Sequence, residues 1–68
     1  MCVIIQEAEN SFFTDTSDPA YAKLHSTITD AVLYIKIICG DEKILIDFSS
    51  LSESTIAELY ELKLAGTL

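Results

Sequence analysis

The fold depends most on the stretch AVLYIKIICGDEKILIDF, residues 31–48. Residues 31–39 and 43–48 are nearly continuous in apolar and β-branched side chains, which is typical of strands. Gly40 and Asp41 lie between the two runs, and glycine suits the first central position of a II′ hairpin turn. A two-residue and a four-residue loop would give the same two faces. The pattern predicts a β-hairpin, with Leu33, Ile35 and Ile37 opposite Phe48, Ile46 and Ile44 on one face, and Tyr34, Lys36 and Ile38 opposite Asp47, Leu45 and Lys43 on the reverse face.

An amphipathic helix is predicted directly after this hairpin. Ser52 is a good N-cap with Glu53 in the first turn, and Ser50 with Glu53 forms a competing capping box. Gly66 is the expected C-terminal stop. The apolar residues span a broad arc, wider than one small sheet needs, and they are Ile56, Leu59, Tyr60, Leu62 and Leu64.

The N-terminal half predicts a strand, a loop and a short helix. Residues 2–6 contain three adjacent apolar residues, which suits an inner strand covered on both faces. Residues 7–17 are polar and irregular apart from Phe12 and Phe13, one of which we expect to cap the core. The alternative is an aromatic anchor offered to a partner. Asp18 and Pro19 are the expected N-cap and first residue of a helix that runs to about Thr27.

Together these elements predict one small α+β domain over residues 1–68, in the order β-α-β-β-α. We expect a three-stranded mixed sheet with both helices on the face of Leu33, Ile35 and Ile37. The alternative places the helices on opposite faces. A chain of 68 residues buries only about 60% of its unfolded surface. Because half of the residues are nevertheless hydrophobic, the composition favours a two-fold dimer.

Charge and hydropathy exclude several classes of function. Eleven acidic residues against four lysines give a formal charge of −7, and the lysines are scattered along the chain. Direct binding of nucleic acid or of an anionic membrane surface needs clustered cations and is therefore not expected. No apolar run is long enough to span a bilayer, and the N-terminus does not resemble a signal peptide. We expect a cytoplasmic protein, in the host cytoplasm if the source is viral, with Cys2 and Cys39 reduced.

No motif names a catalytic chemistry. His25 could in principle pair with Cys2 or Cys39, but nothing in the sequence brings them together. Helix capping accounts for the serines at 49–54. Asp15 and Asp18 lack the glycine and the closing glutamate of a calcium loop, and no phosphate-binding loop, dinucleotide fingerprint or zinc signature is present. The sequence predicts a non-enzymatic protein without cofactor or metal.

Binding through the surface is the remaining function. The sequence predicts a protein–protein interaction module or inhibitor, and the expected partners are a second copy of the chain and an unidentified protein. The alternative is charge mimicry, in which the eleven carboxylates imitate phosphates and block a nucleic-acid-binding protein. In size and charge the chain resembles small acidic phage inhibitors of uracil-DNA glycosylase, restriction or CRISPR enzymes. The candidate partner-binding residues are Tyr34, Ile38, Asp41, Glu42, Leu45, Glu58, Tyr60, Glu61 and Leu62.

Overall fold

The computed structural model describes residues 2–40 and 43–66 and confirms the α+β class with a mixed sheet. The described chain contains two α-helices and four strands, one strand more than the sequence predicts. In chain order the elements are β1 (Cys2–Ala8), β2 (Ser11–Asp15), a 3₁₀ turn η1 (Pro19–Tyr21), β3 (Lys23–His25), α1 (Ile28–Cys39), β4 (Ile44–Ile46), a 3₁₀ turn η2 (Phe48–Ser50) and α2 (Glu53–Leu64).

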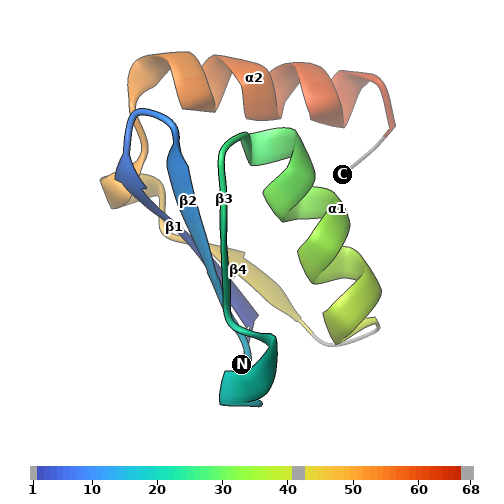
Figure 1. Cartoon of the computed structure of the whole chain (residues 1–68). Helices are drawn as coiled ribbons and strands as arrows, with labels where there is room; N and C mark the ends of the chain where they lie inside the picture. Colours follow the sequence, from blue (N-terminus) through green and yellow to red (C-terminus); the bar gives the residue numbers. More distant parts are fainter. Residues whose placement is uncertain (1, 41–42, 67–68) are drawn as a thin grey trace.

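The four strands of the described sheet lie in the order β3-β2-β1-β4 (Figure 1). β1 and β2 form an antiparallel hairpin with Ile5 opposite Phe13, and β2 pairs antiparallel with β3. β4 returns after α1 to pair with β1 in parallel, with Val3 beside Leu45. β1 is thus an inner strand, as expected. Residues 7–17, predicted as an irregular loop, instead supply the end of β1, a turn and β2.

Residues 28–39 form a helix, so the first strand of the predicted hairpin over residues 31–48 is wrong, and its cross-strand pairs do not exist. The second predicted strand, residues 43–48, is confirmed in part as β4. Thr27 is the N-cap, and its hydroxyl accepts a hydrogen bond from the Asp30 N–H at 3.1 Å. Gly40 ends the helix with a φ of 58°, a conformation that favours glycine. The buried residues follow helical spacing, which decides the outcome over strand propensity: Ile28, Ala31, Val32, Ile35 and Cys39.

The helix predicted from Pro19 to about Thr27 forms only its first turn. Asp18 caps that turn as expected, because its carboxylate accepts a hydrogen bond from the Ala20 N–H at 3.0 Å. The chain then leaves the helical conformation, and residues 23–25 become the edge strand β3. The Thr14 hydroxyl donates to the Lys23 carbonyl at 3.1 Å and holds this strand against β2. Pairing with β2 therefore prevails over the local helix signal.

The ends of α2 agree with the sequence prediction. Ser52 is the N-cap, and its hydroxyl accepts a hydrogen bond from the Thr55 N–H at 3.3 Å. Gly66 follows the last turn with a φ of 80°. Gln6 on β1 fixes this end of the helix in space, since its side-chain oxygen accepts from the Ser52 N–H at 2.7 Å. The β1 backbone adds a second tie, because the Gln6 N–H donates to the Ser50 hydroxyl at 3.0 Å.

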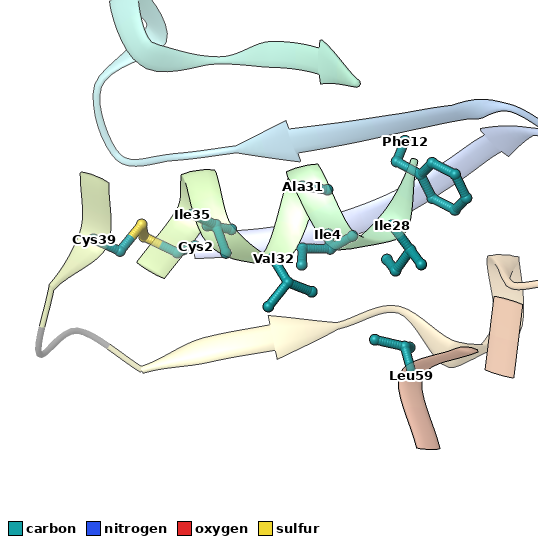
Figure 2. Close-up of a cluster of buried hydrophobic side chains, with 9 residues drawn as sticks. All are labelled: Cys2, Ile4, Phe12, Ile28, Ala31, Val32, Ile35, Cys39 and Leu59. Atoms are coloured by element: carbon teal, nitrogen blue, oxygen red, sulfur yellow. A yellow bond between two sulfur atoms is a disulfide. The ribbon is translucent and has the colours of Figure 1, made fainter. Parts of the chain in front are cut away.

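One hydrophobic core lies between the sheet and the two helices (Figure 2). Both helices contribute to this same core, with α2 crossing one end of α1 (Figure 1), so the alternative with helices on opposite faces is also wrong. Leu33 and Ile37, expected on the buried sheet face, lie instead on the exposed side of α1. The core residues are Cys2, Ile4, Phe12, Ile28, Ala31, Val32, Ile35, Cys39 and Leu59.

A disulfide between Cys2 and Cys39 closes one end of this core, which corrects the expectation of reduced thiols. The first residue of β1 and the last residue of α1 are separated by 37 positions in sequence, but their Cα atoms lie 6.6 Å apart. That separation is within the range that a disulfide spans. The pairing depends on α1 being a helix that lies along β1, which the predicted hairpin could not provide.

Candidate functional site

The sheet has one covered face and one open face. Alternate residues of a strand point to opposite faces, and the buried positions of β1 and β2 are Cys2, Ile4, Gln6, Phe12 and Thr14, which face the helices. The residues between them point away from both helices, and no element of the described chain covers them. We call this second surface the open sheet face, and it consists of Val3, Ile5, Phe13, Leu24 and Leu45.

The strand register makes the open sheet face continuous. Leu24, Phe13 and Ile5 are direct neighbours across β3, β2 and β1. Leu45 and Val3 form a second row across β4 and β1. Leu24 on the edge strand is 57% exposed and Leu45 is 38% exposed. The strands therefore gather apolar side chains from the whole width of the sheet into one patch, which is exposed at Leu24 and Leu45 and half-buried at Val3, Ile5 and Phe13. Contiguous apolar surface of this kind marks interaction sites on soluble proteins.

Acidic side chains border this patch. Asp15 follows Phe13 by two residues on β2 and therefore shares its face, and Glu7 lies beside the patch in the irregularity between Gln6 and Ala8 on β1; both are exposed. Asp15 also lies directly opposite Val3. Of the four lysines, Lys43 beside β4 is the one near the patch, because Lys23 lies on the helix side and the other two belong to α1 and α2. The border is predominantly anionic.

The predicted partner-binding residues do not form one surface. Leu45 alone belongs to the open sheet face. Tyr34 packs against β3, and Ile38 lines a small cleft beside the disulfide. Leu62 packs against the core, whereas Tyr60, Glu58 and Glu61 are exposed on α2. Asp41 and Glu42 lie outside the described residues. The surface assigned to Tyr34, Ile38 and Leu45 was the reverse face of a hairpin that does not form.

Sequence reasoning does not identify Val3, Ile5 or Leu24 as surface residues, and it offers an aromatic anchor at Phe12 or Phe13 without deciding between the two. Val3 and Ile5 belong to an apolar run expected to be covered on both faces. Phe12 and Phe13 are adjacent, and only the pairing of β2 with β1 buries the first and leaves the second on the open side. Leu24 lies on a segment predicted as helix. The sequence shows that these residues are apolar, but it does not show to which face of the sheet each side chain points.

The only histidine belongs to a packed polar cluster between β3 and α1. The Thr14 hydroxyl donates to the Lys23 carbonyl, so the His25 Nε2–H donates to Thr14 Oγ1, at 3.1 Å. The His25 ring contacts the Tyr34 ring at a centroid distance of 4.9 Å, and the Lys23 ammonium lies 5.3 Å from that ring. Burial lowers the pKa of His25, and the charge of Lys23 lowers this pKa further, while Asp30 opposes the shift.

This cluster does not form a nucleophile site. The Thr14 hydroxyl is close to His25, as in a nucleophile–base pair, but Thr14 is fully buried and its hydroxyl proton is already donated. Cys2 and Cys39 are joined in the disulfide and offer no thiolate. Within residues 2–40 and 43–66, no three His, Cys, Asp or Glu side chains are arranged to hold a metal ion.

Two of the hollows among the described residues adjoin β1. One, of about 400 Å³, opens widely to solvent between the end of β1 and the start of α2, beside Gln6 and Ser52. The polar groups of Gln6 there are already bonded within the protein. The other, of about 210 Å³, is an apolar cleft between α1 and β4, lined chiefly by Val32, Ile35 and Ile44. Neither gathers the convergent polar groups that orient a small-molecule ligand.

Comparisons with protein-family models, curated proteins and solved structures find no match for this chain. In the described residues, no helix has the length and apolar character that crossing a bilayer requires. A proposal for the function therefore depends on the geometry and the charge of the protein itself.

Proposed function

We propose that this chain is a non-enzymatic protein-binding module that docks a cationic amphipathic helix of another protein on the open sheet face. The observation that supports the proposal is the continuous apolar patch of Val3, Ile5, Phe13, Leu24 and Leu45, which no described element covers. A sheet face of this kind is most stable when another element packs on it. The function is to bind the partner through this surface. Where the partner needs the same helix for its own activity, binding inhibits the partner.

The charge of the border selects the partner. Glu7 and Asp15 flank the patch on a chain with a formal charge of −7. A helix that carries Lys or Arg on either side of an apolar stripe complements this border, and electrostatic complementarity favours such a partner over neutral or acidic ones. A second copy of this chain would instead bring acidic borders together. The open sheet face is therefore assigned to a different, basic protein.

The test uses a defined probe, a designed helical peptide with a leucine stripe and lysine flanks, compared with the same stripe between glutamates. We expect the lysine peptide alone to bind, and we expect Leu24→Asp to weaken its affinity about ten-fold, because burying one leucine contributes about 1.5–3 kcal/mol. Leu33→Asp on α1 is the matched control, since Leu33 is 45% exposed against 57% for Leu24 and lies outside the patch. Isothermal titration calorimetry measures each affinity.

The direction of this change separates docking from charge mimicry. Leu24→Asp adds a negative charge, so a purely electrostatic interaction with the lysine peptide would become tighter. Docking on apolar side chains becomes weaker, although the carboxylate is attractive. Equal or tighter binding by Leu24→Asp would refute the proposal and support mimicry. An equal loss in Leu33→Asp would also refute it, because the open sheet face would then have no special role.

A further inference from the structure

α2 carries a second exposed surface that the open sheet face does not include. Its core side is formed by Thr55 and Leu59, which are buried. About a quarter-turn away, four exposed residues follow one another at spacings of three, four and three, and we call them the α2 seam: Glu53, Ile56, Tyr60 and Lys63. Ile56 is 42% exposed and Tyr60 is 64% exposed.

The spacing of the α2 seam is that of the a and d positions of a heptad, which line the contact between two packed helices. The exposed side of a surface helix carries mainly polar residues. Here the two central positions are Ile56 and Tyr60, and the charged residues occupy the two ends. Exposed Leu64 and Ala57 widen the same side. The side thus has an apolar centre of the kind that a neighbouring helix covers.

The order of the seam residues is complementary to itself. When two α2 helices run antiparallel with their midpoints together, a positions meet d positions of the other helix. Ile56 then packs against Tyr60 of the second copy, and Glu53 lies beside Lys63 of the second copy. The two-fold symmetry repeats both contacts. A parallel pair would instead set Glu53 beside Glu53 and Lys63 beside Lys63.

We propose that the α2 seam is a homodimer interface, occupied by the α2 helix of a second copy in antiparallel orientation. Charge complementarity identifies the occupant. The seam has its single acid, Glu53, at one end and its single lysine, Lys63, at the other, so an antiparallel second copy places each of them beside its opposite charge. Glu61 lies about 100° around the helix from Tyr60, to one side of the seam. Glu58 lies about 160° around the helix from Tyr60, on the opposite side.

The interface is small. One pair of 12-residue helices buries less area than a standard stable interface. The dimer is therefore expected to be a weak association. A dimer through the α2 seam does not use the open sheet face. The dimer and the proposed function can therefore be tested independently.

Sedimentation equilibrium over roughly 10 µM to 1 mM tests the dimer. We expect the wild type to shift from monomer to dimer with rising concentration, and Tyr60→Glu to weaken the association at least ten-fold, because it places two carboxylates against apolar side chains. Ile37→Glu is the control, since Ile37 is exposed on α1 and should leave the association unchanged.

Charge reversal tests the antiparallel pairing itself. Glu53→Lys or Lys63→Glu alone sets like charges together twice in each dimer, so each should weaken it about three- to ten-fold. The double variant restores opposite charges at both ends and should recover most of the affinity. Failure of the double variant to recover would overturn the pairing. A wild type that stays monomeric throughout, or a dimer lost in Leu24→Asp and kept in Tyr60→Glu, would overturn the interface.

Discussion

His25 shows how a single residue acquires its environment from two elements. Its position on β3 directs the ring toward α1, where it meets Tyr34, and its Nε2–H donates to Thr14 on β2. The sequence shows a single histidine close to Lys23 and indicates no packing partner for it. In the fold it belongs to the packing between an edge strand and a helix. Its protonation is therefore coupled to the stability of that packing.

The lowered pKa of His25 predicts a pH-dependent stability. Its ordinary value is 6.5, and burial and Lys23 lower the pKa in the folded protein. The unfolded chain consequently binds a proton at a higher pH than the folded chain does. Stability is therefore greatest above pH 6.5 and falls as the pH drops below that value, until the folded form is protonated as well.

We expect urea unfolding to show a lower stability near pH 5.5 than near pH 7.5, and His25→Gln to reduce this difference. The glutamine cannot be protonated, and it retains a donor for Thr14. If His25→Gln has the same pH dependence as the wild type, His25 is not the group responsible.

At the scale of elements, residues 28–39 show why strand propensity misled the prediction. Isoleucine and valine are common in strands, and the run ends at a glycine followed by an aspartate, which suits a hairpin. The helical signals are equally present. Thr27 can cap Asp30, and the buried residues recur at helical spacing. Periodicity should have outweighed composition here, because it determines which side chains can share one face.

The disulfide joins two elements that this helix brings together, and its loss should destabilise the protein. In the chain-entropy treatment, closing a loop of this length by the Cys2–Cys39 bond contributes about 4 kcal/mol to the free energy of unfolding. Reduction should lower the melting temperature in a thermal scan with and without a phosphine reductant. The Cys2→Ser, Cys39→Ser double variant is the control, since the reductant should not affect it. Two alkylatable thiols in the unreduced protein would contradict the bond.

A closed disulfide also bears on the compartment. Such bonds persist mainly in oxidising environments, whereas the sequence predicts a cytoplasmic protein. Location in the cytoplasm stays a prediction. To relate the disulfide to the compartment, the thiol state of Cys2 and Cys39 should be measured after rapid acid quenching of cells that express the protein.

At the scale of the whole molecule, the negative charge acts against compactness. A formal charge of −7 is carried by 68 residues within a radius of gyration of 11.0 Å. Like charges at these distances repel when the Debye length is long. Raising sodium chloride from about 10 mM to about 1 M shortens the Debye length from about 30 Å to 3 Å, and should therefore raise the melting temperature by a few degrees.

The same measurement on Glu9→Lys provides the comparison. Glu9 is exposed, and its backbone carbonyl accepts a hydrogen bond from the Gln6 side chain. Replacing it reduces the net negative charge, so the variant should melt higher at low salt and gain less from added salt. A melting temperature that is independent of salt in both proteins would show that repulsion is unimportant. Binding of a cationic helix should respond to salt in the opposite direction, since salt screens that attraction.

Local signals were enough to predict the α+β class, the inner position of β1 and both ends of α2. These signals are adjacent apolar residues, a serine N-cap and a terminal glycine. Each affects only residues a few positions away, so its effect can be predicted from the sequence. The strands β2 and β3, the pairing of all four strands, the disulfide and the open sheet face depend on contacts between distant segments. Phe12 and Phe13 are alike in composition, and only the register of β2 against β1 turns one inward and the other to the surface. Side-chain direction in a strand is a property of its pairing, and pairing exists only once the chain has folded.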